Sequence, residues 1–206
     1  HTINAYFHPL KNEIVFPAGI LQKPFFDPEA DDAINYGGIG TVIAHEMTHS
    51  YDDQGSKFDE KGNLNNWWTE DDKKQFNINA KYYIDEFSSF KVNGKNVNGE
   101  LTLGENLADH GGVKIAYHAL KKHLEITKKV EKISGFTQDE RFFISWANMW
   151  KTKINAIEAD KRIITDPHSP NEWRINGTLA NIPEFHKTFN INKGDEMYRK
   201  DPVQMW

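Results

Sequence analysis

Hydrophobic residues recur mostly at helical spacing along this chain, and segments rich in glycine, proline and asparagine interrupt them. Residues 41–51 carry apolar side chains three or four positions apart, which predicts an amphipathic helix. The preceding segment 37–40 (Gly-Gly-Ile-Gly) is expected to be irregular. Residues 11–16 lie between turn signals and end before Pro17, which predicts a short strand.

Longer helices are predicted downstream, where polar residues of the capping type precede the apolar periodicity. Thr69 and Thr137 each stand three positions before an acidic residue, which is typical of a helix N-cap. Residues 91–99 are rich in turn formers, and Gly111-Gly112 weakens the helix in which it lies. The expected helices cover about 69–87, 103–124, 137–159 and the segment from Pro183 onward. This pattern predicts a mainly α fold with a small β component.

The composition indicates a globular protein and excludes several classes of function. With 206 residues, 38% of them hydrophobic, the chain can form one sizeable core. The net charge of −5 and the lack of a dense basic stripe give no reason to expect a nucleic-acid partner. The chain contains no cysteine, so thiolate metal sites, cysteine nucleophiles and disulfides are excluded. No apolar run approaches the roughly 18 residues of a membrane span.

The most informative motif is His45-Glu46-Met47-Thr48-His49, in the first predicted helix. Residues four apart lie on one face of a helix, so both imidazoles can reach a single ion. Imidazole nitrogens are ordinary ligands of zinc, so His45 and His49 are predicted to bind one Zn²⁺ per chain. Glu46 flanks such an ion instead of binding it. We therefore expect Glu46 to act as a general base on a zinc-bound water.

A second motif, Gly-Glu-Asn-Leu-Ala-Asp at 104–109, places Glu105 and Asp109 four residues apart on a predicted helix. Two like charges on one face slightly destabilise an isolated helix, and a nearby cation or imidazole removes that penalty. Glu105 can supply the third ligand of a two-histidine, one-carboxylate zinc site. Asp109 can accept the other N–H of a ligating histidine and fix its tautomer.

Three other interpretations remain open at this point. The histidines and the carboxylates could each share a solvated helix face by coincidence. The chain could be a zinc-binding module that holds a peptide or a partner without hydrolysing it. It could also be a two-histidine, one-carboxylate iron oxygenase, although the ligands of that class generally lie on strands of a barrel. The glutamate beside His45 favours a hydrolase.

Several segments together resemble the neprilysin and endothelin-converting-enzyme family of zinc metallopeptidases, which includes bacterial oligoendopeptidases. The resemblance covers nearly the whole chain in order and includes both metal motifs. The matching segments are 4–7, 14–22, 35–40, 45–49, 66–69, 103–109 and 166–170, together with Arg174 and Trp206.

The resemblance implies roles for residues outside the metal motifs. His168 is similar to the family histidine that donates a hydrogen bond to the oxyanion, and Arg174 to the arginine that holds a substrate carbonyl. Asn4 and Ala5 match the segment that binds the substrate backbone in the manner of an added strand. The apolar pocket for the residue after the cleaved bond would be formed by Ile20, Phe25, Val42, Met149 and Trp150.

The resemblance also implies a fold and a wider context. Residues 1–206 would form a thermolysin-like zincin catalytic domain, a fragment that lacks the family's other helical domain. That domain and short peptides, cleaved on the amino side of bulky apolar residues, are the expected partners. For the isolated fragment two outcomes stay open: hydrolysis on its own, or an inactive domain. Asp-His-Gly-Gly at 109–112 is similar to bacterial members, many of them exported, which favours the cell envelope over the cytoplasm.

Overall fold

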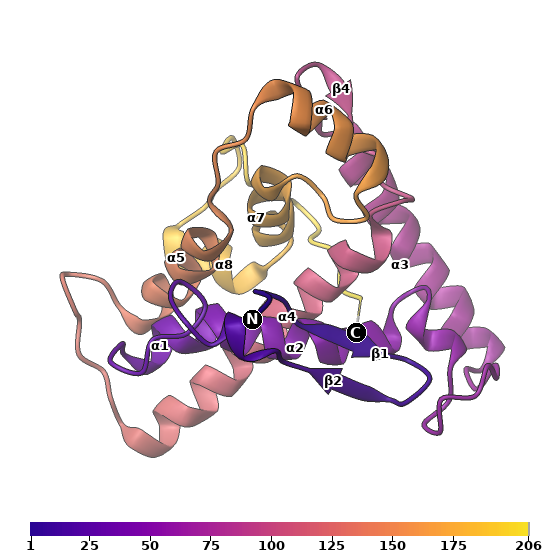
Figure 1. Ribbon diagram of the computed structural model, residues 1–206. Helices are drawn as coiled ribbons and strands as arrows, with labels where there is room; N and C mark the ends of the chain where they lie inside the picture. The colour runs from indigo at the N-terminus through magenta and orange to yellow at the C-terminus, as the bar shows by residue number, and fades with distance from the viewer. Residues whose placement is uncertain (206) are drawn as a thin grey trace.

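The computed structural model describes residues 1–205; Trp206, which belongs to the family resemblance, lies outside them. The chain is mainly helical and has two small antiparallel strand pairs, as the sequence predicts (Figure 1). The strands are β1 (Tyr6–His8), β2 (Glu13–Val15), β3 (Lys91–Val92) and β4 (Lys95–Asn96). The helices are α1 (Asp32–Asn35), α2 (Thr41–Thr48), α3 (Glu70–Ser89), α4 (Leu103–Thr127), α5 (Gln138–Trp150), α6 (Ala156–Thr165), α7 (Asn171–Ala180) and α8 (Pro183–Phe189).

The larger hydrophobic core joins α2, α4, α5 and α8, with fully buried Leu120 and Phe142 among its members. A smaller core lies between α3 and α4 and includes Tyr83 and Phe87, both fully buried. The strand pair β1–β2 lies beside α2, and α6 forms the top of the molecule in the view of Figure 1. Both cores contain side chains of α4, so this helix is the centre of the fold. Within residues 1–205 no helix is long and apolar enough to span a bilayer.

Two glycines let α4 approach α2 closely. Although Gly111-Gly112 weakens the helical pattern, α4 runs unbroken from Leu103 to Thr127. A Cβ on Gly112 would lie 2.8 Å from the backbone oxygen of Thr41 and 3.1 Å from the backbone nitrogen of His45. A Cβ on Gly111 would meet the Thr48 side chain at 2.5 Å. The glycines therefore allow the backbones to pack closely, and this packing compensates their low helix propensity.

The segment 37–40 is less irregular than predicted, since only Gly38 has non-helical backbone angles. Residues Tyr36–Gly40 form a π-helical turn, η2, that leads directly into α2, with a kink at Gly38. A Cβ at Gly37 would lie 2.2 Å from the backbone oxygen of Phe142 on α5. The glycines therefore mark a close contact between backbones, which short-range turn rules cannot distinguish from a loop.

The helix predicted over 137–159 is in fact two helices. Thr137 caps α5 with a full capping box, as expected, but α5 ends at Trp150. The following residues are irregular until Asn155, whose side chain accepts a hydrogen bond from the backbone N–H of Glu158 and starts α6. Helix α7, which begins after Pro170, was not predicted. The division at 151–155 rests on a cap made by one residue, Asn155, whereas α7 starts after Pro170 without a side-chain cap.

The β component is small, as predicted, but it has more strands than the one expected over 11–16. The strand expected over 11–16 is confirmed as β2, which pairs with an unpredicted strand β1, so that Phe7 lies opposite Ile14. The turn-rich segment 91–99 contains the short hairpin β3–β4. Asn93 in this hairpin donates a hydrogen bond to Asp160 of α6 at 3.0 Å. Each hairpin thus connects to an element that borders the cavity described below.

Candidate metal centre

The three predicted zinc ligands lie together where α2 meets the start of α4. His45 lies on α2, His49 opens the short 3-10 turn η3 (His49–Tyr51) after it, and Glu105 lies in the first turn of α4. The Nε2 atoms of His45 and His49 are 3.1 Å apart. The Oε2 atom of Glu105 lies 3.2 Å from Nε2 of His45 and 3.7 Å from Nε2 of His49. The three donor atoms therefore surround one point.

This donor set fits a zinc ion. Ligand atoms at about 2.0–2.1 Å from one tetrahedral ion lie roughly 3.3 Å from each other, close to the separations of His45, His49 and Glu105. The Oε2 atom of Glu105 is buried and accepts no hydrogen bond of ordinary geometry. These three residues also form the one group of His, Cys, Asp and Glu side chains within residues 1–205 that is arranged to hold a metal. The ligands lie on helices, unlike the strand-borne ligands expected of an iron oxygenase.

Each histidine is oriented by a carboxylate. Asp109 Oδ1 accepts a hydrogen bond from His45 Nδ1 at 2.8 Å, the contact that the sequence predicts for it. Asp52 Oδ2 does the same for His49 Nδ1 at 2.7 Å. Both imidazoles therefore present the Nε2 lone pair to the shared point, which is the tautomer that metal binding requires.

Asp52 is a site residue that the sequence reasoning missed. Its other oxygen accepts backbone N–H groups of Gln54 and Gly55 at 2.8 and 2.7 Å, so the carboxylate is fixed on both sides. It is 5% exposed. Its position three residues after His49 could have identified Asp52 as a partner of that histidine, since residues three apart share a helix face.

The charges around the point favour a cation. Burial disfavours a charged imidazole, but the neighbouring carboxylates of Asp109 and Glu105 raise the pKa of His45 to about 10. Burial would raise the pKa of Glu105, but His45 and the neighbouring imidazoles hold it well below its usual range. The cluster thus combines carboxylates with imidazole nitrogens, which is a donor set that zinc accepts.

Glu46 is not part of the ligand set and lines the adjoining cavity together with His45. Only 5% of it is exposed. Burial raises the pKa of its carboxyl group, while the imidazoles of His45 and His49 oppose this rise. A raised pKa moves a carboxylate towards the operating pH, where a general base is most effective.

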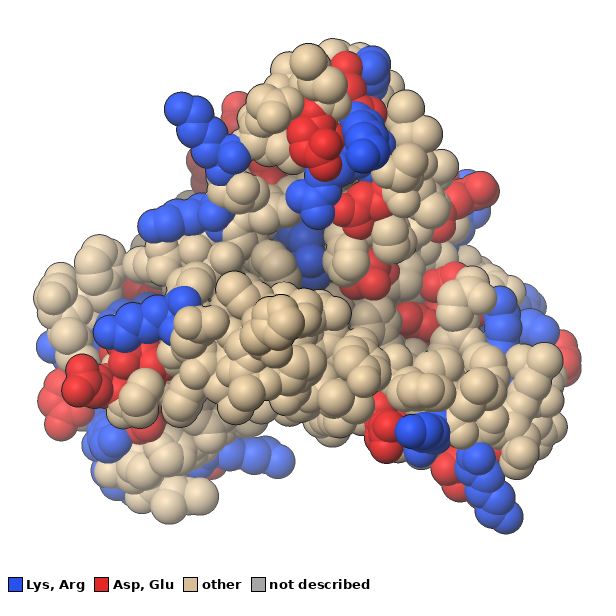
Figure 2. Space-filling model, viewed as in Figure 1, with Lys and Arg blue, Asp and Glu red and all other residues tan. Residues whose placement is uncertain are grey.

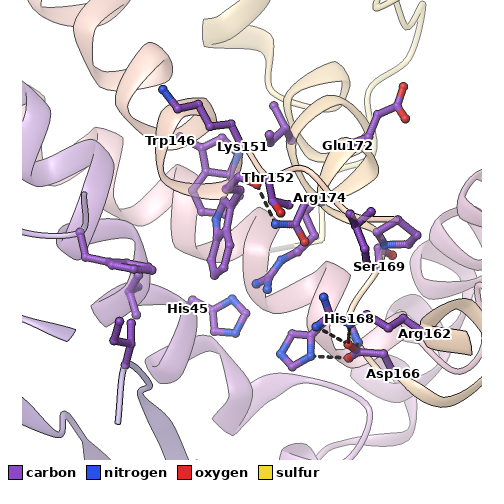
Figure 3. A pocket seen from close by; sticks show the side chains of 18 of the residues that line it. His45, Trp146, Lys151, Thr152, Arg162, Asp166, His168, Ser169, Glu172 and Arg174 are labelled. Atoms are coloured by element: carbon purple, nitrogen blue, oxygen red, sulfur yellow. Dashed lines mark hydrogen bonds and ion pairs between the residues drawn. The ribbon is translucent and has the colours of Figure 1, made fainter. Parts of the chain in front are cut away.

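His168 lies opposite α2 in the loop between α6 and α7. Its Nε2 atom is 3.2 Å from Oε2 of Glu105, and its Nδ1 atom is 2.8 Å from Oδ1 of Asp166. Asp166 also accepts the backbone N–H of His168 at 3.0 Å. Figure 3 shows His168 joined to Asp166, with the His45 ring nearby on the same cavity. The predicted oxyanion donor therefore faces the candidate metal centre.

Arg174 on α7 is 5% exposed and makes a bidentate ion pair with Asp109. Its Nε and Nη2 atoms donate to the two oxygens of Asp109 at 2.7 and 2.6 Å. Its guanidinium lies 3.9 Å from the ring centroid of Trp150, close enough for a cation–π interaction. Burial favours the neutral form of Asp109, but Arg174 and His45 keep its pKa below the usual range. Arg174 lines the cavity, where its remaining N–H donors are available.

The metal centre opens into a cavity of about 640 Å³. Figure 2 shows this face of the molecule hollowed near its centre, with charged side chains above the hollow and a mostly uncharged surface below it. The sequence-predicted residues that line the cavity are Asn4, Ala5, Ile20, Phe25, Val42, Glu46, Trp150, His168 and Arg174. Nine of the predicted site residues other than the metal ligands thus share one space with His45.

Met149 is the pocket prediction that the structure does not support. Its side chain is 6% exposed and packs in the larger core, and it is not among the residues that line the cavity. Trp146, which was not predicted, lines the cavity instead. Trp146 and Trp150 are four positions apart on α5 and share a face, whereas Met149 is turned about 100° from Trp150.

The chain matches the model of Peptidase family M13 over residues 4–205. It is 41% identical over 212 residues to Neprilysin-3 of Drosophila melanogaster, covering 100% of this chain and 26% of that protein. It is 40% identical over 206 residues to human Endothelin-converting enzyme 1, and this match covers 99% of this chain and 27% of that protein. The chain therefore spans about a quarter of the length of the curated relatives it matches.

Solved structures agree with this match. The crystal structure of the Mycobacterium tuberculosis zinc metalloprotease ZMP1 in complex with an inhibitor superimposes with a TM-score of 0.95 at 44% identity. That match covers 99% of this chain and 32% of ZMP1. PEPO from Lactobacillus rhamnosis gives a TM-score of 0.86 at 38% identity. From its sequence, its zincin-like fold and these similarities, the chain belongs to Peptidase family M13.

Proposed function

We propose that this chain is the catalytic portion of a zinc-dependent endopeptidase that hydrolyses short peptides on the amino side of bulky apolar residues. The observation that carries the proposal is the convergence of His45, His49 and Glu105 on one point beside a cavity that contains Glu46 and His168. A non-catalytic zinc module would not need a buried carboxylate and an imidazole oriented by Asp166 in that cavity.

Each residue has a separate part in the reaction. His45, His49 and Glu105 would hold the zinc ion, which when bound supplies Lewis acidity and lowers the pKa of a water towards about 7. Glu46 accepts a proton from the attacking water and later delivers it to the leaving amine. His168 donates a hydrogen bond to the carbonyl oxygen as negative charge develops there.

Other residues bind and orient the substrate. Arg174, held in place by Asp109 and Trp150, directs its remaining N–H donors at a carbonyl on the amine side of the cleaved bond. Asn4 and Ala5 precede the edge strand β1 and pair with an extended substrate backbone. Ile20, Phe25 and Val42 supply an apolar wall for the side chain that follows the cleaved bond.

The decisive experiment measures zinc content and hydrolysis of a short apolar peptide, with and without a chelator. It is run on the natural polypeptide that contains this chain and, in parallel, on residues 1–206. One zinc per chain and chelator-sensitive cleavage by the natural polypeptide are expected. Activity of residues 1–206 alone would show that this portion suffices, and zinc without cleavage would assign substrate placement to the rest of the polypeptide. A folded, metal-replete sample without zinc would overturn the proposal.

Substitution of the base separates metal binding from chemistry. Glu46→Gln is expected to lower kcat by at least about 100-fold, because the amide cannot accept the proton, while one zinc per chain is retained. Glu125→Gln, which removes the same charge from an exposed position on α4, is the matched control and should leave kcat unchanged. Retained hydrolysis in Glu46→Gln, or loss of its zinc, would contradict the role of Glu46.

A further inference from the structure

A buried hydrogen bond fastens the loop that carries His168 to the helix that carries Glu105. Ser169 Oγ donates to Asn106 Oδ1 at 2.7 Å. The two residues are only 2% and 1% exposed. Ser169 directly follows His168, and Asn106 directly follows Glu105. The bond therefore joins the two backbone segments whose side chains meet at the metal centre.

Asn106 is itself held from the other side. Its Nδ2 donates to Thr102 Oγ1 at 3.0 Å, and the Thr102 hydroxyl donates to the backbone oxygen of Asn98 at 3.1 Å. Both polar atoms of the Asn106 amide are thus satisfied, and its orientation is determined by its partners. A chain of hydrogen bonds runs from the start of α4 to the loop 166–170, and every side chain in it is buried.

His168 depends on such an anchor because its own side chain is 42% exposed. Asp166 fixes the rotation of the ring, but Asp166 belongs to the same loop and moves with it. The helix before the loop is attached to the hairpin β3–β4 largely through exposed contacts, such as Lys95 with Asp160. None of these interactions fixes the distance between the loop and α4.

We propose that Asn106 and Ser169 are positioning residues that hold His168 at its working distance from Glu105. Loss of either partner leaves the other buried without its hydrogen bond, so the loop is favoured to shift until water reaches the free group. Displacement of a catalytic group by about 1 Å can cost on the order of 100-fold in rate. This inference rests on the proposed function, since it assigns the pair a part in turnover.

The test compares Ser169→Ala with the unchanged natural polypeptide, loaded with zinc. We expect kcat to fall about 10- to 100-fold while KM stays within about twofold, because His168 acts on charge that develops after binding. Zinc content should remain at one per chain. Hydrogen exchange of the backbone amides of Asp166, His168 and Ser169 should become faster, because the loop has lost its hydrogen bond to α4.

Two further variants separate positioning from general stability. Ser169→Thr keeps the hydroxyl and should recover most of kcat and of the exchange protection. Ser145→Ala is the matched control: this serine is 7% exposed and its hydroxyl donates to the backbone oxygen of Ile34 at 2.7 Å, on a different part of the fold. It should leave both the loop exchange and kcat unchanged.

A double-variant cycle completes the test. If Ser169 and Asn106 act through one hydrogen bond, Asn106→Ala combined with Ser169→Ala should lose little more kcat than the worse single variant. If Asn106→Ala does not fold, kcat and loop exchange in Ser169→Ala and Ser169→Thr are sufficient to test the proposal. Unchanged kcat and exchange in Ser169→Ala would overturn the proposal, and so would an equal loss in Ser145→Ala. If the unchanged polypeptide does not hydrolyse peptides, the proposed function fails, whereas the exchange measurement still tests the anchor.

Discussion

Asp109 is shared between two functional residues. One of its oxygens accepts hydrogen bonds from both His45 and Arg174, and the other accepts a second bond from Arg174. Asp109 is 1% exposed, so its negative charge is compensated mainly by these two partners. The histidine that would hold the metal and the arginine that would hold the substrate are therefore oriented by one carboxylate.

At the residue scale, Asp52→Ala should weaken zinc binding by about 10- to 100-fold, because His49 loses the carboxylate that fixes its Nδ1 proton. Competition with a chromophoric chelator measures this change. Asp53→Ala removes the same charge one position along without a contact to His49 and serves as the control. Equal weakening in both variants would show that net charge, not the hydrogen bond, explains the effect.

The sequence predicts which side chains of each motif lie together, because each motif is local: the i and i+4 positions of one helix determine which side chains share a face. It predicts less of what surrounds them. Asp52 acts from a turn, and its contact depends on how the chain leaves α2. Trp146 lines the cavity and Met149 does not, because of how α5 is rotated against the core. Only long-range packing determines that rotation.

At the element scale, the centre depends on the distance between α2 and α4. Gly112→Ala should destabilise the fold by about 1–3 kcal/mol and weaken zinc binding, because the added methyl meets the backbone of α2 beside His45. Urea unfolding and zinc competition measure the two effects. Gly111→Ala, whose methyl meets the Thr48 side chain, is the comparison. Unchanged zinc affinity in Gly112→Ala would show that α2 can move without affecting its ligands.

The end of α4 is tied to α1 by charges that respond to pH. Asp32 Oδ2 lies 2.8 Å from Lys129 Nζ and 3.0 Å from His123 Nε2. The hydrogen bond from Lys129 holds the pKa of Asp32 below its usual value, against the effect of burial. A lowered pKa in the folded state gives stability that is present above the unfolded pKa and is lost as pH falls through the folded value.

Asp32→Asn should therefore unfold more easily than the unchanged chain near pH 6, by less than about 1 kcal/mol because the pair is partly exposed. This difference should shrink as the pH is lowered from about 4 towards the lowered pKa of Asp32. Urea midpoints between pH 6 and pH 3 measure it. A difference that stays constant over this range would contradict an electrostatic origin.

The misassigned elements have two causes. The glycines at 37–40 act by contact with distant backbone, and the division of 137–159 follows the cap made by Asn155. Local patterns predict where an amphipathic helix starts and which face it buries. They do not show whether a glycine ends a helix or lets another element approach.

At the scale of the whole molecule, the metal would join α2 to the central helix α4, so zinc binding and global stability should be linked. Removal of zinc by a chelator should lower the Tm of the chain, and added zinc should restore it. A concentration of free zinc 1,000 times the Kd adds about 4 kcal/mol. His45→Ala should have a Tm that does not change with zinc; a zinc-dependent Tm in this variant would place the ion elsewhere.

The cavity is built from two sources that the chain keeps apart. The candidate metal donors lie on α2, η3 and α4, whereas Ile20 and Phe25 reach the cavity from the segment before α1. For protein engineering, this separation means that selectivity can be altered without rebuilding the reactive centre. A library randomised at positions 20 and 25 samples new side-chain preferences while every residue that contacts the ion stays unchanged.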